Sequence, residues 1–551
     1  MSLHPQPIAP IPAETARVAR AAFPRGNPYM RMRDELGVFY QDAAFAALFP
    51  ARGQPALSPW RLALVLVLQY AEGLSDRQAA DAVRSRIDWK YALSLELTDP
   101  GFDASVLSEF RSRLVAGSQE QLLLDAMLDG FKAQGLLKAR GRQRTDSTAV
   151  LAAIRTLNRL ECIGETLRHA LNRLARAAPE WLRPHLDPAW AERYGPRFDE
   201  YRLPKGDAAR QALAEQIGRD GFQLLAAIYT PDAPAALRAL PAVEALRQVW
   251  LQQFYAPEPD GTTHWRRPRD LPPAARMLNS PHDRDARYTY KRSTAWIGYK
   301  VHLTETCDPD TPHLLTHVET TVAPTPDREP LPRIHQALAR KAVLPRAHLV
   351  DAGYVDGATL AHSQQDYGIA VIGPAPPNST WQARRAAGFD GAGFAIDWDR
   401  RTATCPAGQT SAPGATIRTR RGYELIYFQF ARQDCQACAQ RAACTTAHAG
   451  RRLTIRSKAE HLALQAARQY QTTPEFKAQY DARAGVEGTL SQGLRVCALR
   501  RARYIGLAKT HLQHVLTAAA LNVLRIAHWL DDPRLARTRS APFLALLPQA
   551  G

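Results

Sequence analysis

Three carboxylates stand at places in the chain where they could do chemistry. Asp146 lies in a short segment whose Thr and Val content predicts a strand. Asp351 directly follows the apolar run 348–350, and Glu487 lies in a late helical segment. Carboxylate oxygens suit Mg²⁺, and functional groups collect at the carboxyl ends of strands in α/β sheets. The alternative for Asp351 is a turn or cap role, which is the more frequent use of such an Asp.

The segment around Glu487 predicts a helix over residues 474–491. Tyr480, Arg483 and Glu487 are three and four residues apart in turn, which places them on one helical face, and Arg495 continues that face. A solvated surface stripe is the alternative. Three glycines weaken this helix, which indicates that another group approaches its backbone closely: Gly485, Gly488 and Gly493.

A second cluster of chemically capable residues consists of cysteines. Four of the seven cysteines gather late in the chain, and two of them form a Cys-x₂-Cys pair: Cys405, Cys435, Cys438 and Cys444. Four thiolates can hold one Zn²⁺ tetrahedrally with no open position, so we predict a structural and not a catalytic zinc site. Four reduced, unlinked thiols are the alternative. An odd number of cysteines in a chain without a visible secretory signal indicates a reducing compartment.

Hydrophobic periodicity and breaks predict a mixed, α-rich fold whose sheet carries the first two carboxylates. In residues 296–306, apolar side chains alternate with polar ones, and 314–322 is the expected antiparallel partner strand. The predicted units are a flexible arm (1–28), a helical N-terminal domain (29–138), an α/β core (139–154, 285–374 and 457–531), a helical insertion (155–284), a Cys-rich insertion (375–456) and an irregular tail (532–551).

The helical N-terminal domain contains a candidate DNA-binding motif. Two predicted helices, 62–70 and 76–84, are separated by a short Gly-containing turn, and Ser75 suits the N-cap of the second. Three arginines accompany them, which is compatible with a helix-turn-helix: Arg77, Arg84 and Arg86. A plain helical hairpin has the same pattern and is the alternative.

Composition restricts the classes of partner. The 551 residues include 71 Lys or Arg and 53 Asp or Glu, a net charge of +18, and 45% are hydrophobic. This composition excludes an intrinsically disordered chain and favours a polyanionic partner such as nucleic acid. Scattered charge that only aids solubility is the alternative. The sequence has no apolar run long enough to span a membrane, so no membrane partner is expected.

The polar face of the predicted strand 296–306 carries two further candidates. Lys300 and His302 lie opposite the apolar face of that strand. We predict that they point at bound DNA, with a solvated sheet face as the alternative.

Four motifs, taken together, resemble the DDE transposases of bacterial insertion sequences. They are Arg144-Thr-Asp-Ser-Thr148, Trp296-Ile-Gly-Tyr-Lys-Val-His-Leu-Thr-Glu-Thr306, Leu349-Val-Asp-Ala-Gly-Tyr354 and Arg483-Ala-Gly-Val-Glu-Gly-Thr-Leu-Ser491. They follow the family's order over residues 30–530. The resemblance implies a ribonuclease-H-like core with a mixed five-stranded sheet. It assigns the catalytic triad to Asp146 on the first strand, Asp351 after the fourth, and Glu487 on a following helix.

The resemblance also covers the family's Tyr-Arg-Glu-Lys signature, with one departure. Tyr480, Arg483 and Glu487 match it, but Leu494 stands where the family has Lys, and Arg495 is the nearest cation. We therefore expect the DNA phosphates to be contacted by Tyr480, Arg483, Arg495 and Lys300.

The family's activity follows as an expectation. Asp146, Asp351 and Glu487 would hold two Mg²⁺ or Mn²⁺ ions, which stabilise charge on both oxygens in phosphodiester cleavage. Water would cut the 3′ ends of the element, and the freed 3′-OH would attack target DNA. The expected partners are double-stranded DNA, as terminal inverted repeats and target, and a second copy of the chain in a synaptic assembly.

We expect such a chain in the bacterial cytoplasm, associated with the nucleoid. Two alternatives stay open at this point: a non-catalytic DNA-binding descendant of a transposase, and a metal-dependent nuclease that cuts DNA without joining it.

Overall fold

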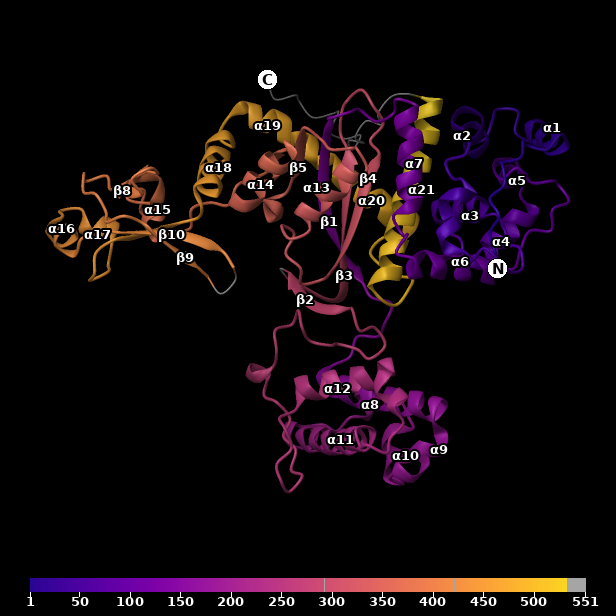
Figure 1. The fold of residues 1–551 in the computed structure, drawn as a ribbon, viewed down its shortest axis with the longest axis horizontal. Coiled ribbons are helices and arrows are strands. Elements are labelled where there is room, and N and C mark those ends of the chain that lie inside the picture. Colours follow the sequence, from indigo (N-terminus) through magenta and orange to yellow (C-terminus); the bar gives the residue numbers. More distant parts are fainter. Residues whose placement is uncertain (292, 420–421, 533–551) are drawn as a thin grey trace, which may run out of the picture.

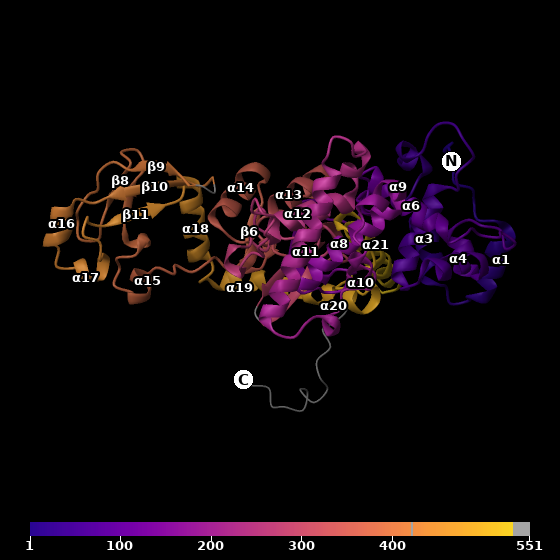
Figure 2. The same cartoon turned by 90° about the horizontal axis from the view of Figure 1, so that it is seen from below.

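A computed structural model describes residues 1–291, 293–419 and 422–532. The predicted irregular tail therefore lies outside the described residues, apart from Asp532. A twisted sheet forms the centre of the molecule, with N-terminal helices on one side and the Cys-rich region on the other (Figure 1). The helical insertion lies beyond one end of the sheet. The view from below shows the Cys-rich region, the sheet and the N-terminal helices in a row (Figure 2). None of the described helices is long and apolar enough to cross a membrane.

The central sheet is mixed, as predicted. Its five expected strands are β1 (Arg142–Leu151), β3 (Thr294–Thr306), β4 (Leu315–Val322), β5 (Ala347–Val350) and β6 (Ala370–Ile372). They lie in the order β4, β3, β1, β5, β6, with β3 antiparallel to β4 and β1, and with β1, β5 and β6 parallel. The centre of β3 is buried on both faces, so the sheet is covered by helices on each side.

The expectation of a five-stranded sheet was wrong by one strand. The sheet has six strands, because β2 (Arg287–Lys291) pairs antiparallel with the beginning of β3. The side chains of β2 are exposed or half-exposed along its whole length. Its two tyrosines, Tyr288 and Tyr290, alternate with polar residues, but the run is only five residues long and both rings are exposed, so no buried apolar face marks it as part of the sheet.

The sheet and the N-terminal helices share one hydrophobic core. The helix α21 (Leu507–Asp531) contacts β4 on one side and α3 (Pro59–Ala71) on the other. The side-chain amide of Asn522 accepts a hydrogen bond from Leu315 N at 2.8 Å and donates one to Leu315 O at 2.9 Å. This amide satisfies the backbone at the start of β4, which is otherwise an open sheet edge.

The predicted flexible arm at residues 1–28 is wrong for its middle part. Residues Ala13–Ala22 form the helix α1, whose Ala19 is fully buried. The buried hydroxyl of Thr15 donates to Leu95 O at 2.8 Å. The segment looked irregular because it is rich in Pro and Ala, but its prolines stand before the helix and after it, and Ala is the best helix former.

The two helices of the candidate helix-turn-helix are present. They are α3 and α4 (Asp76–Ser85), and Ser75 and Gln78 form a capping box at the start of α4. Arg84 is paired with Asp81, and Arg86 with Glu72 and Asp88. These two arginines are thus engaged within the domain, and DNA reading by this motif stays a prediction.

Each of the two insertions has a hydrophobic core of its own. The helical insertion contains α8 (Arg159–Ala177), α11 (Asp207–Ile228) and α12 (Pro241–Gln253). The Cys-rich insertion is built on a small antiparallel sheet of β9 (Ala415–Arg418), β10 (Glu424–Gln429) and β11 (Arg452–Ile455). Its core has only eight buried residues, among them Phe428 and Phe430, so apolar burial stabilises this unit weakly. The helix α18 (Lys458–Tyr470), which was not predicted, then leads back to the core against α14 (Gly357–Tyr367).

A buried ionic cluster joins the sheet to the C-terminal helices. Glu305 on β3 is fully buried and accepts hydrogen bonds from Arg144 Nε at 2.7 Å, Arg525 Nη1 at 2.6 Å and Thr489 Oγ1 at 2.6 Å. Burial raises the pKa of Glu305, but the charges of Arg525 and Arg144 outweigh it, so the pKa lies below its ordinary value. The carboxylate is therefore ionised and shared by two guanidinium groups.

Replacing Glu305 with Gln should lower the free energy of unfolding by about 3 kcal/mol, because it leaves two buried guanidinium groups without their counter-charge. Urea unfolding of the full chain measures the change. Glu109→Gln is the matched control, since Glu109 is 47% exposed in its pair with Arg113 and its loss should cost about 0.5 kcal/mol or less. Equal costs for the two variants would contradict the role of the cluster.

The same carboxylate gives the stability a pH dependence of known sign. A carboxyl group with a lowered pKa in the folded state stabilises the fold above its unfolded value of about 4.5, and this stabilisation is lost as pH falls through the lowered pKa. The wild-type chain should therefore lose more stability between pH 5 and pH 3 than Glu305→Gln does, by about 1 kcal/mol or more.

Candidate active site

The strand register places the two aspartates side by side. Parallel pairing of β1 with β5 sets Thr145 opposite Val350, so the next residues, Asp146 and Asp351, follow at the same level on neighbouring strands. Burial raises the pKa of the Asp146 carboxyl above its ordinary value; the charge of Asp351 adds to this, while the Ser147 N–H and Arg483 oppose it. The interaction between the two carboxylates shows that the sheet brings them together.

Asp351 also caps a turn, which was the alternative to a catalytic role. It follows β5, and its Oδ1 accepts a hydrogen bond from Gly353 N at 2.8 Å, at the start of a short 3₁₀ turn over residues 352–354. This bond uses one carboxylate oxygen. Within the described residues, Oδ2 has no hydrogen-bond partner, so it is free to serve a ligand.

The third carboxylate is joined to the first by Arg483. Its Nη1 donates to Asp146 Oδ2 at 3.0 Å, and its Nη2 donates to Glu487 Oε1 at 3.3 Å. Arg483 is also stacked over the ring of Tyr480, with 5.7 Å between the guanidinium carbon and the ring centroid. The guanidinium thus supplies the positive charge shared by two carboxylates, and Glu487 remains 67% exposed. Arg495 lies further along the same helix, exposed to solvent.

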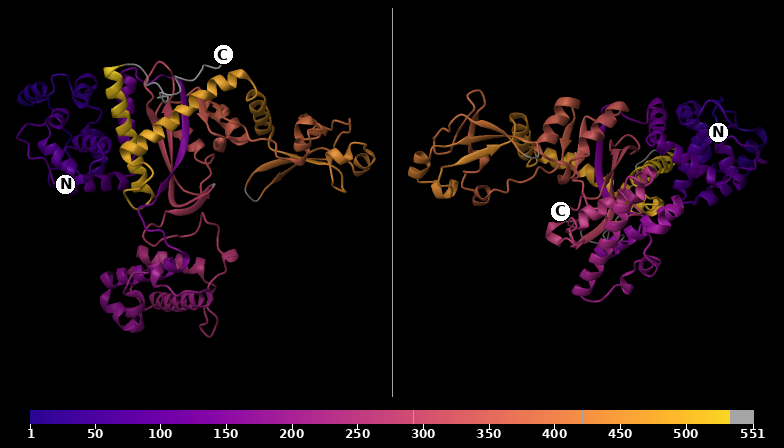
Figure 3. Two further views of the ribbon diagram at one scale, coloured as in Figure 1. Left: turned by 180° about the vertical axis from the view of Figure 1, so that it is seen from behind. Right: turned by 60° about the horizontal axis from the view of Figure 1, so that its bottom comes forward.

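The predicted continuous helix over residues 474–491 was wrong. The chain forms α19 (Pro474–Tyr480), a 3₁₀ turn (Asp481–Ala484) and α20 (Gly485–Cys497). Seen from behind, this pair of helices crosses the sheet from the Cys-rich side towards α21 (Figure 3). Arg144 causes the change at residue 482, because its Nη1 donates to Ala482 O and takes that carbonyl out of the helical pattern.

The expectation that Lys300 points at DNA was wrong, and so was the alternative of a solvated face. The Lys300 side chain is 11% exposed, and its Nζ donates to Asp327 Oδ1 at 2.8 Å and to Thr325 O at 2.5 Å. His302 is fully buried against the hydroxyl of Tyr354. Both faces of β3 are covered, so a polar residue on this strand faces other protein groups and not solvent.

Asp327 is a carboxylate at the site that sequence reasoning missed. It lies in the loop after β4, and its Oδ1 accepts a hydrogen bond from Ser147 Oγ at 3.2 Å besides the bond from Lys300. A side chain at Gly353 would meet Asp327 and Asp351 oxygens at the same distance of 3.1 Å, so the two carboxylates flank this glycine. In the Pro-rich run 323–327, the sequence predicts a turn role for an Asp. No local pattern indicates that Lys300 is its partner.

The close approach expected at the glycines of α20 occurs at two of them, Gly485 and Gly493. A Cβ at Gly485 would lie 2.1 Å from Arg144 Nη1, so the absent side chain makes room for that guanidinium. At Gly488 a Cβ would meet no neighbouring group within 4 Å, and the expectation was wrong there. At Gly493 the nearest group is the packed side chain of Leu499, at 3.1 Å.

The four clustered cysteines line one small pocket of the Cys-rich insertion, and none of them is in a disulfide. Burial raises the pKa of the Cys444 thiol; Arg451 opposes this, and the other three thiols add to it, which shows that all four interact. The backbone N–H of Arg451 donates to Cys435 Sγ at 3.3 Å. The fold therefore collects the four predicted ligands in one place.

Neither the three carboxylates nor the four cysteines are arranged as a complete metal site. Among the described residues, no group of three or more His, Cys, Asp or Glu side chains is arranged to hold a metal ion. For the carboxylates, the Arg483 guanidinium contacts two of the three groups. The metal predictions therefore rest on which residues the fold brings together.

Two family models match the chain. A transposase DDE domain matches residues 404–527, and a second transposase domain (DUF772) matches residues 17–113. Together these matches fit a DDE transposase of the insertion-sequence type. No curated protein and no solved structure matches the chain. The net positive charge of the chain is consistent with a partner that is nucleic acid.

The matched ranges cover only part of the candidate site. The DDE-domain match includes Glu487, Arg483, Tyr480 and the four clustered cysteines, but it begins after Asp146 and Asp351. Those two aspartates are linked to the matched part by the bond from Arg483 to Asp146 and by the strand register. The N-terminal match begins inside α1, in agreement with the packing of that helix on the domain.

The glycines of α20 give a matched pair of variants. Gly485→Ala should lower the free energy of unfolding by about 1–3 kcal/mol, because the new methyl group overlaps Arg144, which is buried and held by Glu305. Gly488→Ala should raise it by up to about 1 kcal/mol, because it meets nothing and favours the helix. Chemical denaturation measures both. Shifts of the same sign would show that Arg144 does not restrict this helix.

Proposed function

We propose that this transposase cuts the 3′ ends of its element and transfers the 3′-OH to target DNA, with Asp146, Asp351 and Glu487 as the catalytic carboxylates. The observation that carries the proposal is the joining of three distant segments at one place: parallel pairing sets Asp146 beside Asp351, and Arg483 bonds both Asp146 and Glu487. Action on two element ends requires at least a dimer of the chain.

The topology supports a ribonuclease-H-like core. Without β2, the sheet has the five strands and the placement that the resemblance implies. Asp146 lies on the first strand, Asp351 follows the fourth, and Glu487 lies on a later helix that contacts the first strand. The two insertions enter this core between strands or after its last strand, so they leave the strand pairings intact.

The donor set fits two divalent cations. Asp146, Asp351 and Glu487 offer oxygen ligands only, and the half-buried Asp146 already has a cation, Arg483, as its partner. When bound, Mg²⁺ or Mn²⁺ would stabilise the negative charge on the attacking and leaving oxygens of the phosphodiester. Asp327 is paired with Lys300 and also bonds the hydroxyl of Ser147. We propose that Asp327 positions Ser147, the residue next to Asp146.

The remaining residues of the signature act on the DNA. Arg483 presents a planar fork of donors beside the carboxylates, and such a fork pairs well with a phosphate. Exposed Arg495 lies on the same helix, in the part of the chain where the family's Lys is missing, and we propose that it contacts a neighbouring phosphate. Tyr480 stacks on Arg483 and limits its motion.

Asp351→Asn and Glu487→Gln should each reduce cleavage of element-end DNA by at least about a hundredfold, since each removes charge that holds a cation. Glu475→Gln, an exposed carboxylate on α19, is the control and should cut normally. Flanking DNA of the coding gene supplies the substrate, and gel analysis separates cut from joined product. Cutting without joining would favour the nuclease alternative, and wild-type binding without metal-dependent cutting would favour the non-catalytic descendant.

Asp146→Asn should abolish cleavage without lowering the melting temperature. The raised pKa means that folding disfavours the ionised carboxylate, so the stability associated with this group is lost as pH rises through that pKa. At pH 7 the neutral Asn should therefore leave the free energy of unfolding within about 1 kcal/mol of wild type, or raise it. A large loss of stability would show that Asp146 serves the fold and not the reaction.

We also propose a structural Zn²⁺ held by Cys405, Cys435, Cys438 and Cys444. The support is the convergence of four unlinked thiols on one pocket, in a unit whose apolar core is small. Zinc binding would supply the stability that this core lacks.

Elemental analysis of the purified chain should find one zinc ion per chain. Cys435→Ser and Cys438→Ser should each remove most of it, whereas Cys162→Ser, in the separate core of the helical insertion, should retain it. Cobalt substitution gives a second readout, since a tetrahedral thiolate site absorbs visible light. A folded wild-type chain without zinc would refute the proposal.

A further inference from the structure

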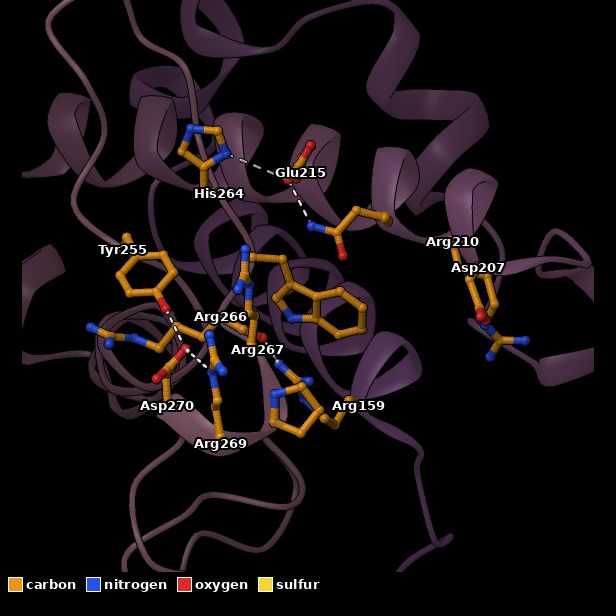
Figure 4. A pocket seen from close by; sticks show the side chains of 13 residues that line it. Arg159, Asp207, Arg210, Glu215, Tyr255, His264, Arg266, Arg267, Arg269 and Asp270 are labelled. Carbon is orange, nitrogen blue, oxygen red and sulfur yellow. Dashed lines mark hydrogen bonds and ion pairs between the residues drawn. The ribbon is translucent and has the colours of Figure 1, made fainter.

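The helical insertion contains a basic cavity that the proposed chemistry does not use. Its volume is about 810 Å³, within the range of ligand pockets, and five arginines line it against three carboxylates. The side chains of Arg159, Arg266, Arg267 and Arg269 gather on one side of it, while Asp207 and Arg210 lie at the opposite side (Figure 4).

The basic side of the cavity is built by a hairpin. The chain leaves α12 and returns antiparallel to itself, with Phe254 bridged to Trp265 and Gly261 at the tip with φ +84°. Arg266 N donates to Gln253 O at 2.8 Å, which closes the base of the hairpin. Thr263 is buried and Trp265 packs on the insertion core, so the hairpin presents residues 266–269 from a fixed support.

Two of these arginines are held in place by neutral groups. Arg159 lies 4.1 Å above the ring of Trp265 and donates to Gln253 Oε1 and to Arg266 O. Arg266 lies 4.7 Å above the ring of Tyr255, and its Nε donates to Phe254 O. Because aromatic faces and neutral oxygens fix them, little side-chain freedom would be lost when they bind a ligand.

The charges of these arginines are not neutralised. Within the described residues, Arg159, Arg266 and Arg267 have no ion pair, and Arg269 has only a long contact of 3.9 Å with Asp270. Arg159 is half-buried and is the first residue of α8, where the helix dipole adds further positive potential. A partly buried cation without a counter-ion is costly, so this place favours an anion.

Two of the three carboxylates that line the cavity accept hydrogen bonds from neutral side chains, and the third, Asp207, lies away from the hairpin beside Arg210. Asp270 accepts the hydroxyl of Tyr255 at 2.7 Å, and Glu215 accepts the amide of Gln211 at 2.7 Å. Arg210 is paired with Glu200. Five guanidinium groups against three carboxylates leave an excess of positive charge in the lining, and four of these five groups lie on the hairpin side.

We propose that Arg159, Arg266, Arg267 and Arg269 bind the phosphodiester backbone of DNA, so that the helical insertion grips the duplex away from the carboxylates. The inference rests on the proposed function for the choice of DNA as the anion. Guanidinium groups suit phosphate oxygens, and four on one surface match a run of phosphates better than a single small ligand.

The test compares two triple variants of the full chain with the same loss of charge. Arg266→Ala/Arg267→Ala/Arg269→Ala removes the hairpin cations, and Arg173→Ala/Arg176→Ala/Arg183→Ala removes three exposed arginines of the same insertion that lie outside the cavity. Fluorescence anisotropy with a random-sequence duplex at several salt concentrations gives the affinity and its salt dependence. A third variant, Arg266→Lys/Arg267→Lys/Arg269→Lys, keeps the charge.

The hairpin variant should bind at least about tenfold more weakly at low salt, and its salt slope should fall by about two to three, since each phosphate contact contributes about 0.9. The control should match wild type, and the Lys variant should retain most of the slope. Equal affinity and slope in the hairpin variant would overturn the proposal. So would tight binding of a deoxynucleoside monophosphate or of inorganic phosphate that leaves duplex binding unchanged, because the cavity would then hold a small ligand.

The outcomes also separate this inference from the proposed function. If the wild-type chain binds no duplex, both fail. If it binds and cuts DNA while the hairpin variant binds equally well, only the inference fails. Asp351→Asn should bind duplex with wild-type affinity, because its loss concerns cleavage and not the grip of the insertion.

Discussion

The buried carboxylate of Glu305 is the interaction on which the arrangement of the site depends. It binds Arg144 of β1, Thr489 of α20 and Arg525 of α21, so one charge fixes two helices on the sheet. Arg144 is two residues before Asp146 and therefore lies on the same face of β1. Thr489 is two residues after Glu487, about 200° around the helix. Turning Thr489 inward thus turns Glu487 outward, which explains why Glu487 is 67% exposed.

Bringing several carboxylates together at the site costs free energy, and the cations of the site offset part of this cost. Asp351 lies close to both Asp146 and Asp327, and its charge disfavours the ionisation of Asp146. Lys300 offsets this at Asp327, and Arg483 at Asp146 and Glu487. Burial, with a smaller contribution from the charge of Asp351, still raises the pKa of Asp146, so Arg483 and the Ser147 N–H offset the cost only in part. Residual strain of this kind is common where a fold is arranged for a ligand and not for its own stability.

Sequence patterns predicted the features that local physics decides. Alternation gave β3 and β4, an apolar run gave β5, and the cap at Ser75 gave the start of α4. The proposed triad residues were selected because four motifs occur together in the order of the family that they resemble. The missed features depend on partners far along the chain. The break at residue 482 needs Arg144, and the burial of Lys300 needs Asp327. No local window contains both members of these pairs.

The insertion and the reaction site are linked by a short stretch of chain. Arg159, which lines the basic cavity, follows Asp146 by thirteen residues. Fully extended, such a segment spans at most about 45 Å, and much of it is the strand β1. A B-DNA duplex rises about 3.4 Å per base pair, so this span corresponds to about 13 base pairs. A duplex of little more than one helical turn can therefore reach from the carboxylates to the hairpin. The length of β1 and of the segment that follows it, and not the fold of the insertion, sets where along the DNA such a grip would fall.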